Sequence, residues 1–177
     1  MSGGADGAGA PGGAGHPPRL THLDDAGRAR MVDVSAKPVT VREARAEGRV
    51  LCSPEVLALL TSGGLPKGDA LAVARIAGLQ AAKRTPELVP LAHPVAVHGV
   101  VVDLVVADDG VRIGAAVRTA DRTGVEMEAL TCVVAAALTF VDMVKAVDKH
   151  TRITDVRVVA KSGGRSGDWV ADDDRQA

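Results

Sequence analysis

The sequence predicts an α+β fold of the ferredoxin-like kind, an antiparallel sheet with helices packed on one face. Segments with strand character alternate with segments of helical period, in the order strand, helices, strand, strand, helix, strand. A turn signal, Asp108-Asp109-Gly110, joins the two middle strands into a hairpin. The chain has 177 residues, of which 46% are hydrophobic, and this fits one domain with a sizeable core.

The first predicted strand covers residues 41–51, where side chains alternate with period two. Thr40 and Glu43 could also form a helix capping box, but no apolar stripe of helical period follows them. The strand is therefore preferred, with one face solvated. The apolar face consists of Ala44, Ala46, Gly48 and Val50, and the charged face of Glu43, Arg45, Glu47 and Arg49.

Two helices are predicted next. Ser53-Pro54-Glu55 has the residue types of an N-cap and first turn, and Gly63-Gly64 ends that short helix. A second helix runs from about Asp69 to Lys83, and we expect Thr85-Pro86 to stop it.

The second half of the chain begins with the strands at 97–107 and 111–119, which are rich in valine and isoleucine. A long helix is predicted over 124–149, with Thr123 and Glu126 spaced as a capping box. A last strand at 153–160 precedes the Gly-rich run 161–167.

The ends of the chain are predicted to lie outside the folded domain. Residues 1–18 are mostly Gly, Ala and Pro, a composition typical of a disordered tail. Residues 19–168 form the single domain, and 169–177 form a polar C-terminal tail. Met31 to Val34 is a short apolar island that could be an edge strand or an ordered loop.

Composition argues against several classes of partner. The net charge is −1 and the chain holds one Phe, one Trp and no Tyr, so we expect no nucleic-acid binding. No run of about 18 uninterrupted apolar residues and no signal peptide are visible, so no membrane association and a cytoplasmic location are expected. Cys52 and Cys132 lack metal-ligand spacing and are read as reduced thiols. We expect no metal and no cofactor.

The long helix offers a candidate catalytic pair. Asp142 and Lys145 are three residues apart, and at about 100° per residue Lys145 falls within the margin of an apolar stripe. A partly desolvated lysine beside a carboxylate suits general acid–base chemistry. The alternative is an ordinary exposed ion pair. The stripe consists of Leu130, Val134, Ala137, Val141 and Val144.

Other candidates lie in loops and at a helix start. Lys67 and Lys161 lie in the Gly-rich runs 63–68 and 161–167, and such runs suit an anionic ligand. His93, within a rigid Pro-flanked segment, suits either a ligand contact or a structural hydrogen bond. Glu126 and Glu128 favour the helix dipole, and could also contact the polar edge of a heterocyclic base.

Taken in order, eight motifs resemble the cyclic pyranopterin monophosphate synthases, the molybdenum cofactor biosynthesis protein C family. The resemblance covers about Leu20 to Asp168, with two departures: Ala92 stands where the family often has Cys, and Val141 where an aromatic residue is common. The motifs are MVDVSAK at 31–37, KGD at 67–69, ARIAG at 74–78, QAAKRT at 80–85, PL and HP at 90–94, TGVEMEALT at 123–131, DM and KA at 142–146, and KSGG at 161–164.

The resemblance implies a lyase-type reaction. Family members convert 3′,8-cyclo-7,8-dihydro-GTP, made by an upstream radical GTP cyclase, to cyclic pyranopterin monophosphate and release pyrophosphate. It further implies a homohexamer, a trimer of dimers with active sites at subunit interfaces. Carried over by motif, the catalytic residues are Asp142, Lys145 and Lys67, and the substrate-binding residues are Leu91, Ala92, His93, Glu126, Met127, Glu128 and Lys161. The alternative function is a non-catalytic nucleotide-binding regulatory module.

Overall fold

The computed structural model describes Asp24, residues 26–165 and residues 167–172. The chain divides into two compact units between Val32 and Asp33. The predicted N-terminal tail, residues 1–18, lies outside the described residues.

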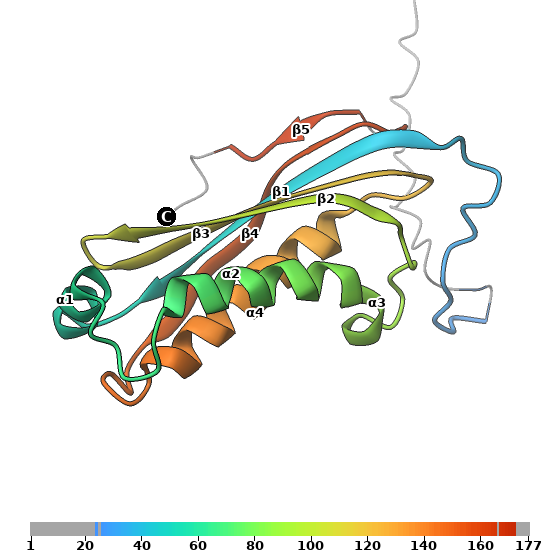
Figure 1. The fold of residues 1–177 in the computed structure, drawn as a ribbon. Helices are drawn as coiled ribbons and strands as arrows, with labels where there is room; N and C mark the ends of the chain where they lie inside the picture. The colour runs from blue at the N-terminus through green and yellow to red at the C-terminus, as the bar shows by residue number, and fades with distance from the viewer. Residues whose placement is uncertain (1–23, 25, 166, 173–177) are drawn as a thin grey trace, which may run out of the picture. The chain divides into compact units, whose positions relative to one another are not determined.

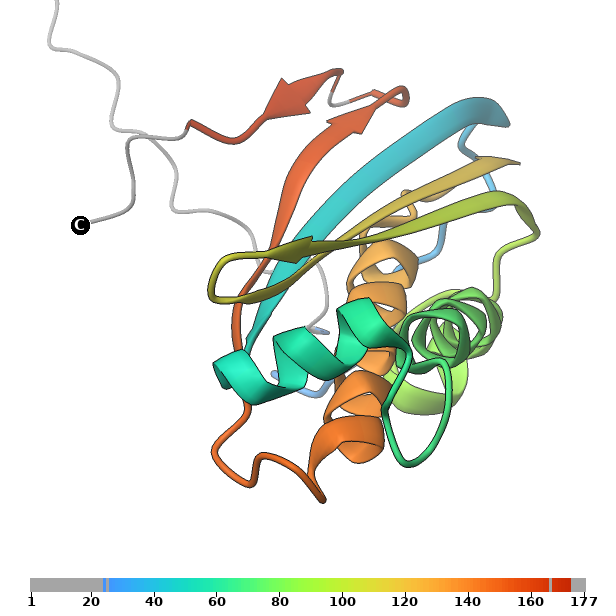
Figure 2. The ribbon, with the colours of Figure 1, turned by 60° about the vertical axis from the view of Figure 1, so that its left-hand side comes forward.

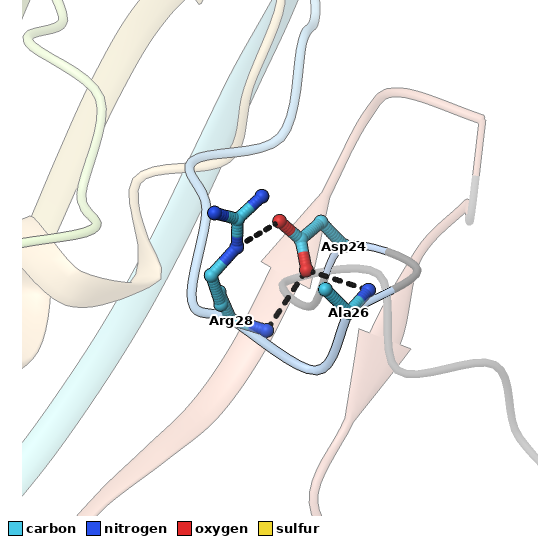
Figure 3. Close-up of polar contacts among 3 residues, drawn as sticks. All are labelled: Asp24, Ala26 and Arg28. Carbon is cyan, nitrogen blue, oxygen red and sulfur yellow. Dashed lines mark hydrogen bonds and ion pairs between the residues drawn. The ribbon is translucent and has the colours of Figure 1, made fainter.

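The first unit contains a small turn built by Asp24 (Figure 3). One oxygen of its carboxylate accepts hydrogen bonds from the main-chain N–H groups of Ala26 and Arg28, and the other accepts one from Arg28 Nε, all at 2.9 Å. The apolar island from Met31 to Val34 is a loop and not an edge strand. Short polar side chains that bond their own backbone in this way favour turns over regular structure.

The second unit is built on a five-stranded sheet in the order β2-β3-β1-β4-β5, with every neighbouring pair antiparallel. β1 and β2 run parallel with β3 between them, which is the split arrangement of a ferredoxin-like fold and confirms the predicted α+β class. The strands are β1 (Thr40–Leu51), β2 (Val97–Ala107), β3 (Gly110–Asp121), β4 (Arg152–Ser162) and β5 (Trp169–Val170).

Helices cover one face of this sheet, as Figures 1 and 2 show. α4 packs on β1, β3 and β4, and α2 packs on β2 and along α4. The helices are α1 (Pro54–Ser62), α2 (Ala70–Ala81), a 3-10 turn (Ala82–Arg84), α3 (Thr85–Leu88) and α4 (Glu126–Val144).

Local sequence accounts for most of these boundaries. Ser53 Oγ accepts a hydrogen bond from Val56 N at 3.4 Å, and Gly63 ends α1 with a left-handed φ of 70°. Asp69 caps α2 by accepting from Ala72 N at 2.9 Å. In β1, Ala44 and Val50 are fully buried against the helices, so the predicted period of two is confirmed.

Four boundaries differ from the predictions. α4 begins after Val125 with no side-chain cap, so the capping box is wrong, and it ends at Val144 and not at Lys149. Pro86 lies in the first turn of α3, where its missing N–H costs nothing, so it starts a further helical turn. Trp169–Val170 pair with Ala160 and Lys161 of β4 as β5, although the sequence placed them in the tail.

α4 is the central helix of the core. It is the one helix in the described part of the chain that is long and apolar enough to cross a membrane, yet half of it is buried inside the fold. Phe140, Cys132 and Val133 are fully buried beneath the sheet. These contacts are those of a core helix.

Candidate functional site

The C-terminal end of α4 carries a cluster of one carboxylate and two ammonium groups. Lys67 Nζ donates to Asp142 Oδ2 at 2.7 Å and to the main-chain oxygen of Asp142 at 2.8 Å. Lys145 Nζ lies 2.6 Å from the other carboxylate oxygen, Oδ1. The three predicted catalytic side chains therefore meet within one chain.

The fold produces this cluster by bringing the loop before α2 against the end of α4. Gly68 adopts φ 85°, a conformation that favours glycine, and it lets the chain turn directly into the N-cap Asp69. Cations are also favoured at this position because the last carbonyl groups of a helix carry partial negative charge. Lys67 uses one of those carbonyls directly.

Two close ammonium groups fix the protonation state of Asp142. Hydrogen bonds from Lys145 and then from Lys67 lower its pKa from 3.8 to about 2. Asp142 is therefore an ionised acceptor at neutral pH.

The predicted desolvation of Lys145 is wrong within the single chain, because 60% of its side chain is exposed. The buried face of α4 lies at a different angle about the helix axis from the predicted apolar stripe. Val134 of that stripe is 43% exposed, whereas Cys132 and Ala136, outside it, are fully buried. Nearly every residue from Ala129 to Val141 is apolar, so hydrophobic period alone could not fix the buried face.

A second polar cluster lies at the N-terminal end of α4. Lys161 Nζ bonds Glu126 Oε1 at 3.0 Å, with both side chains about 70% buried. Glu128 is 3% exposed, and burial, with the nearby charge of Glu126, raises its pKa. A pocket of about 180 Å³ opens here, lined by Lys37, Arg42, Glu43, Thr123, Gly124, Glu126, Lys161, Ser162 and Gly163.

Arg42 is a residue of this pocket that the sequence reasoning did not single out. Its Nε donates to the main-chain oxygen of Asp121 at 2.9 Å, and a Cβ on Gly164 would collide with its guanidinium group. Gly164 thus leaves the space that Arg42 occupies. The available signal was periodicity, since Arg42 shares the face of the buried Ala44 and a charge there is unexpected.

The loop after α3 holds the predicted contacts Leu91, Ala92 and His93. Ala92 and His93 are half-buried, while Leu91 is 36% exposed and Met127 of α4 is 40% exposed. His93 lies close enough to Asp33 for its charge to help lower the pKa of that carboxyl group, after the hydrogen bonds from Ser35.

The two clusters are far apart within one chain. Glu128 and Asp142 are separated by 14 residues of α4, about 21 Å along a helix axis. Because α2 starts beside Asp142 and its Gly78 contacts Cys132, the chain after α2 runs to the N-terminal end of α4. The Lys67–Asp142–Lys145 cluster therefore stands alone at one end, and Glu126, Glu128 and Lys161 gather at the other.

The two cysteines are free thiols. Burial raises the pKa of Cys52 to about 11 and that of Cys132 to about 12, so both thiols are protonated at neutral pH. Within the described ranges, no group of three or more His, Cys, Asp or Glu side chains could hold a metal ion.

Comparisons with known proteins agree with the motif pattern. A model of the MoaC family matches residues 31–164. A Streptomyces coelicolor protein named cyclic pyranopterin monophosphate synthase is 68% identical over 162 residues, which cover 90% of this chain and 95% of that protein. Proteins of the same name from Nocardioides sp. and Roseiflexus sp. are 64% and 59% identical, cover 86% of this chain each, and are themselves covered over 96% and 98% of their lengths.

Proposed function

The chain belongs to the MoaC family, and we propose that it is a cyclic pyranopterin monophosphate synthase, a lyase of molybdenum cofactor biosynthesis. In this proposal it converts 3′,8-cyclo-7,8-dihydro-GTP to cyclic pyranopterin monophosphate and releases pyrophosphate. The observation that carries the proposal is the Lys67–Asp142–Lys145 cluster. Residues 19–168 form the catalytic domain.

The chemistry of the cluster suits this reaction. Lys67 and Lys145 supply protons and positive charge, and Asp142 holds both ammonium groups in place. Proton transfer to and from a rearranging ring requires such a positioned donor. A departing pyrophosphate also requires neutralisation by cations.

The rest of the substrate occupies the opposite cluster. Glu126 and Glu128 bind the polar edge of the heterocycle and Lys161 contributes positive charge. Further substrate contacts come from Leu91, Ala92, His93 and Met127. Since the clusters lie at opposite ends of α4, each active site draws one cluster from each of two chains. This fits a homohexamer, a trimer of dimers, acting in the cytoplasm after an upstream radical GTP cyclase.

The test replaces Asp142 and Lys145 separately by Ala and supplies purified cyclised GTP derivative. We expect both variants to remain folded oligomers and to lose turnover by about 100-fold or more, the scale of general acid–base catalysis. Lys149→Ala is the control, an exposed lysine four residues further along. Near-normal rates in both variants would end the assignment, and binding of GTP analogues without any product would favour a regulatory module.

A further inference from the structure

The end of α4 continues past its last helical residue as one further turn, which carries both Lys145 and Asp148. The main-chain N–H of Lys145 donates to the oxygen of Val141 at 2.9 Å, and that of Asp148 donates to the oxygen of Val144 at 3.0 Å. Lys145 and Asp148 are therefore held in one hydrogen-bonded turn. A displacement of Asp148 would also displace the backbone of Lys145.

The carboxylate of Asp148 is held in place by its own turn. Its Oδ1 accepts a hydrogen bond from the main-chain N–H of His150 at 2.8 Å, and Thr151 Oγ1 donates to the main-chain oxygen of Asp148 at 3.0 Å. Acidic side chains that accept from the backbone two residues further on are common in turns. The second carboxylate oxygen is thereby oriented for a more distant contact.

This second oxygen of Asp148 reaches the end of the central strand β1. Asp148 Oδ2 accepts from the main-chain N–H of Ser53 at 2.9 Å. Ser53 lies just beyond β1 and caps α1, and α1 leads into the loop that carries Lys67. Hydrogen bonds from His150 and then from Ser53 lower the pKa of Asp148. The acceptor is therefore ionised at neutral pH, and hydrogen bonds to ionised groups are the stronger ones.

The three proposed catalytic side chains come from two segments, residues 53–69 and residues 142–148. Among the residues that the structure describes, hydrogen bonds join these segments at two points. One is the contact of Lys67 with Asp142, whose side chains are to act on the substrate. The other, from Ser53 to Asp148, uses no proposed catalytic group, so it can persist while the catalytic side chains exchange partners.

The position of Asp148 is unfavourable for α4 itself. The last carbonyl groups of a helix carry partial negative charge, which favours cations and disfavours a carboxylate nearby. Lys145 follows this rule and Asp148 does not. The two hydrogen bonds that the carboxylate accepts, and not the stability of the helix, therefore account for an acid at this position.

We propose that Asp148 is a positioning residue, which holds the turn that carries Lys145 against the start of α1 and so keeps Lys145 and Asp142 aligned with Lys67. This inference rests on the proposed function, because it concerns the same cluster. The side chain of Lys145 is 60% exposed, so its own packing does little to fix it. Its accuracy depends on a fixed backbone, and a displacement of about 1 Å in a reacting group can cost about 100-fold in rate.

The test compares the wild-type chain with Asp148→Ala on the purified cyclised GTP derivative. Loss of the acceptor for Ser53 should lower kcat by roughly 10- to 100-fold. KM should change little, because Glu126 and Glu128 bind the rest of the substrate at the other end of α4. Amide hydrogen exchange of residues 142–148, followed by mass spectrometry, should become faster and report the loosened turn independently of turnover.

Two conservative variants separate the hydrogen bond from the charge. Asp148→Asn keeps an oxygen acceptor without the charge, so it should recover much of the wild-type kcat. Asp148→Glu keeps the charge but displaces the acceptor by one methylene group, so it should resemble Asp148→Ala. Asp109→Asn is the control for charge. After burial, the charges of Asp148 and Asp109 both raise the pKa of Cys52, but Asp109 pairs with Arg49 and not with either segment, so its kcat should be unchanged.

Ile113→Val is the control for a loss of stability alone. Ile113 is fully buried in β3, so the shorter side chain should lower Tm through lost packing and leave kcat intact. An active wild type with an unchanged kcat in Asp148→Ala would overturn the positioning role alone, as would recovery by Glu but not by Asn. The contrast between Asn and Glu also decides the matter if Asp148→Ala does not fold. A wild-type chain that forms no product would instead end the proposed function, and the positioning role with it.

Discussion

At the scale of residues, the two ends of α4 differ in the pKa of their acidic side chains. The pKa of Asp142 is lowered and that of Glu128 is raised. Asp142 has its pKa lowered to about 2, so its contribution to stability is present above its ordinary value of 3.8 and is lost as pH falls towards 2. The cluster is 40–60% exposed, and exposed ion pairs add little stability. The ion pairs of this cluster therefore add little to the stability of the fold, and their main role is in the proposed reaction.

Glu128 behaves in the opposite way. Its pKa is raised by burial, so ionisation opposes folding once pH rises above the ordinary value of 4.5 and through the folded value. We expect Glu128→Gln to raise Tm at pH 8, by roughly 2–4 °C for each kcal/mol of penalty removed. The difference from wild type should disappear below pH 4.5, which calorimetry at both pH values would measure.

Glu55→Gln is the matched control for this change, since Glu55 is exposed in the first turn of α1. Its Tm should differ little from wild type at either pH. A Glu128→Gln variant that is less stable than wild type at pH 8 would show that the ionised carboxylate is stabilised by its surroundings, and would contradict the burial argument.

At the scale of elements, α2 and α4 approach closely because Gly78 has no side chain. A Cβ at Gly78 would lie 3.0 Å from the main-chain oxygen of Cys132 and 3.2 Å from its Sγ. The neighbouring atoms belong to the backbone and interior of a core helix, so they yield with difficulty. The pairing of these helices also sets the distance from Lys67 to Asp142.

Gly78→Ala therefore tests helix packing against helix propensity. Alanine is favoured over glycine in a helix by about 1 kcal/mol, whereas overpacking a core costs roughly 1–3 kcal/mol. We expect urea unfolding to show a lower free energy of unfolding for this variant. Turnover should also fall, because a shift of α2 would displace the loop that carries Lys67. Gly114→Ala, with no atom near its Cβ, should not be destabilised, and a stabilised Gly78→Ala would contradict the packing argument.

The elements also show where sequence period is informative. β1 was predicted well because charged residues alternate with apolar residues and one glycine from Glu43 to Val50, and a shift by one residue would bury the charges. α4 was predicted poorly in orientation because apolar residues surround it, so several faces satisfied the same pattern. Its C-terminal end moved from Lys149 to Val144 because no glycine or proline marks that boundary.

At the scale of the whole molecule, the separation of the two clusters makes a prediction about mixed assemblies. Glu128→Ala and Lys145→Ala chains should each be inactive alone. If each site takes one cluster from each chain, a mixed dimer has one intact and one doubly defective site. Random mixing should then restore about a quarter of wild-type turnover, because half of the pairs are mixed.

The control mixes two chains that both carry Lys145→Ala, one of which also carries Glu128→Ala. No intact site can form in that mixture, so activity should stay at the background level. Mixed assemblies verified by mass but equally inactive would show that sites are not shared between chains.

The sequence by itself determined the order of elements, the ferredoxin-like class and the residues that resemble a synthase site. These follow from local rules, since caps, turns and two-residue alternation are read within a few neighbouring positions. The motifs identified Lys67 and Asp142, which are 75 residues apart, but no motif could show that the two side chains are in contact at 2.7 Å.

Only the tertiary structure decided which groups meet. Packing of α2 along α4 brings Lys67 to Asp142, and it leaves Glu128 at the far end of the same helix. Packing also determined which face of α4 is buried and left Lys145 exposed. Each of these outcomes depends on contacts between distant segments, which no local pattern in an almost uniformly apolar helix or a single strand can specify.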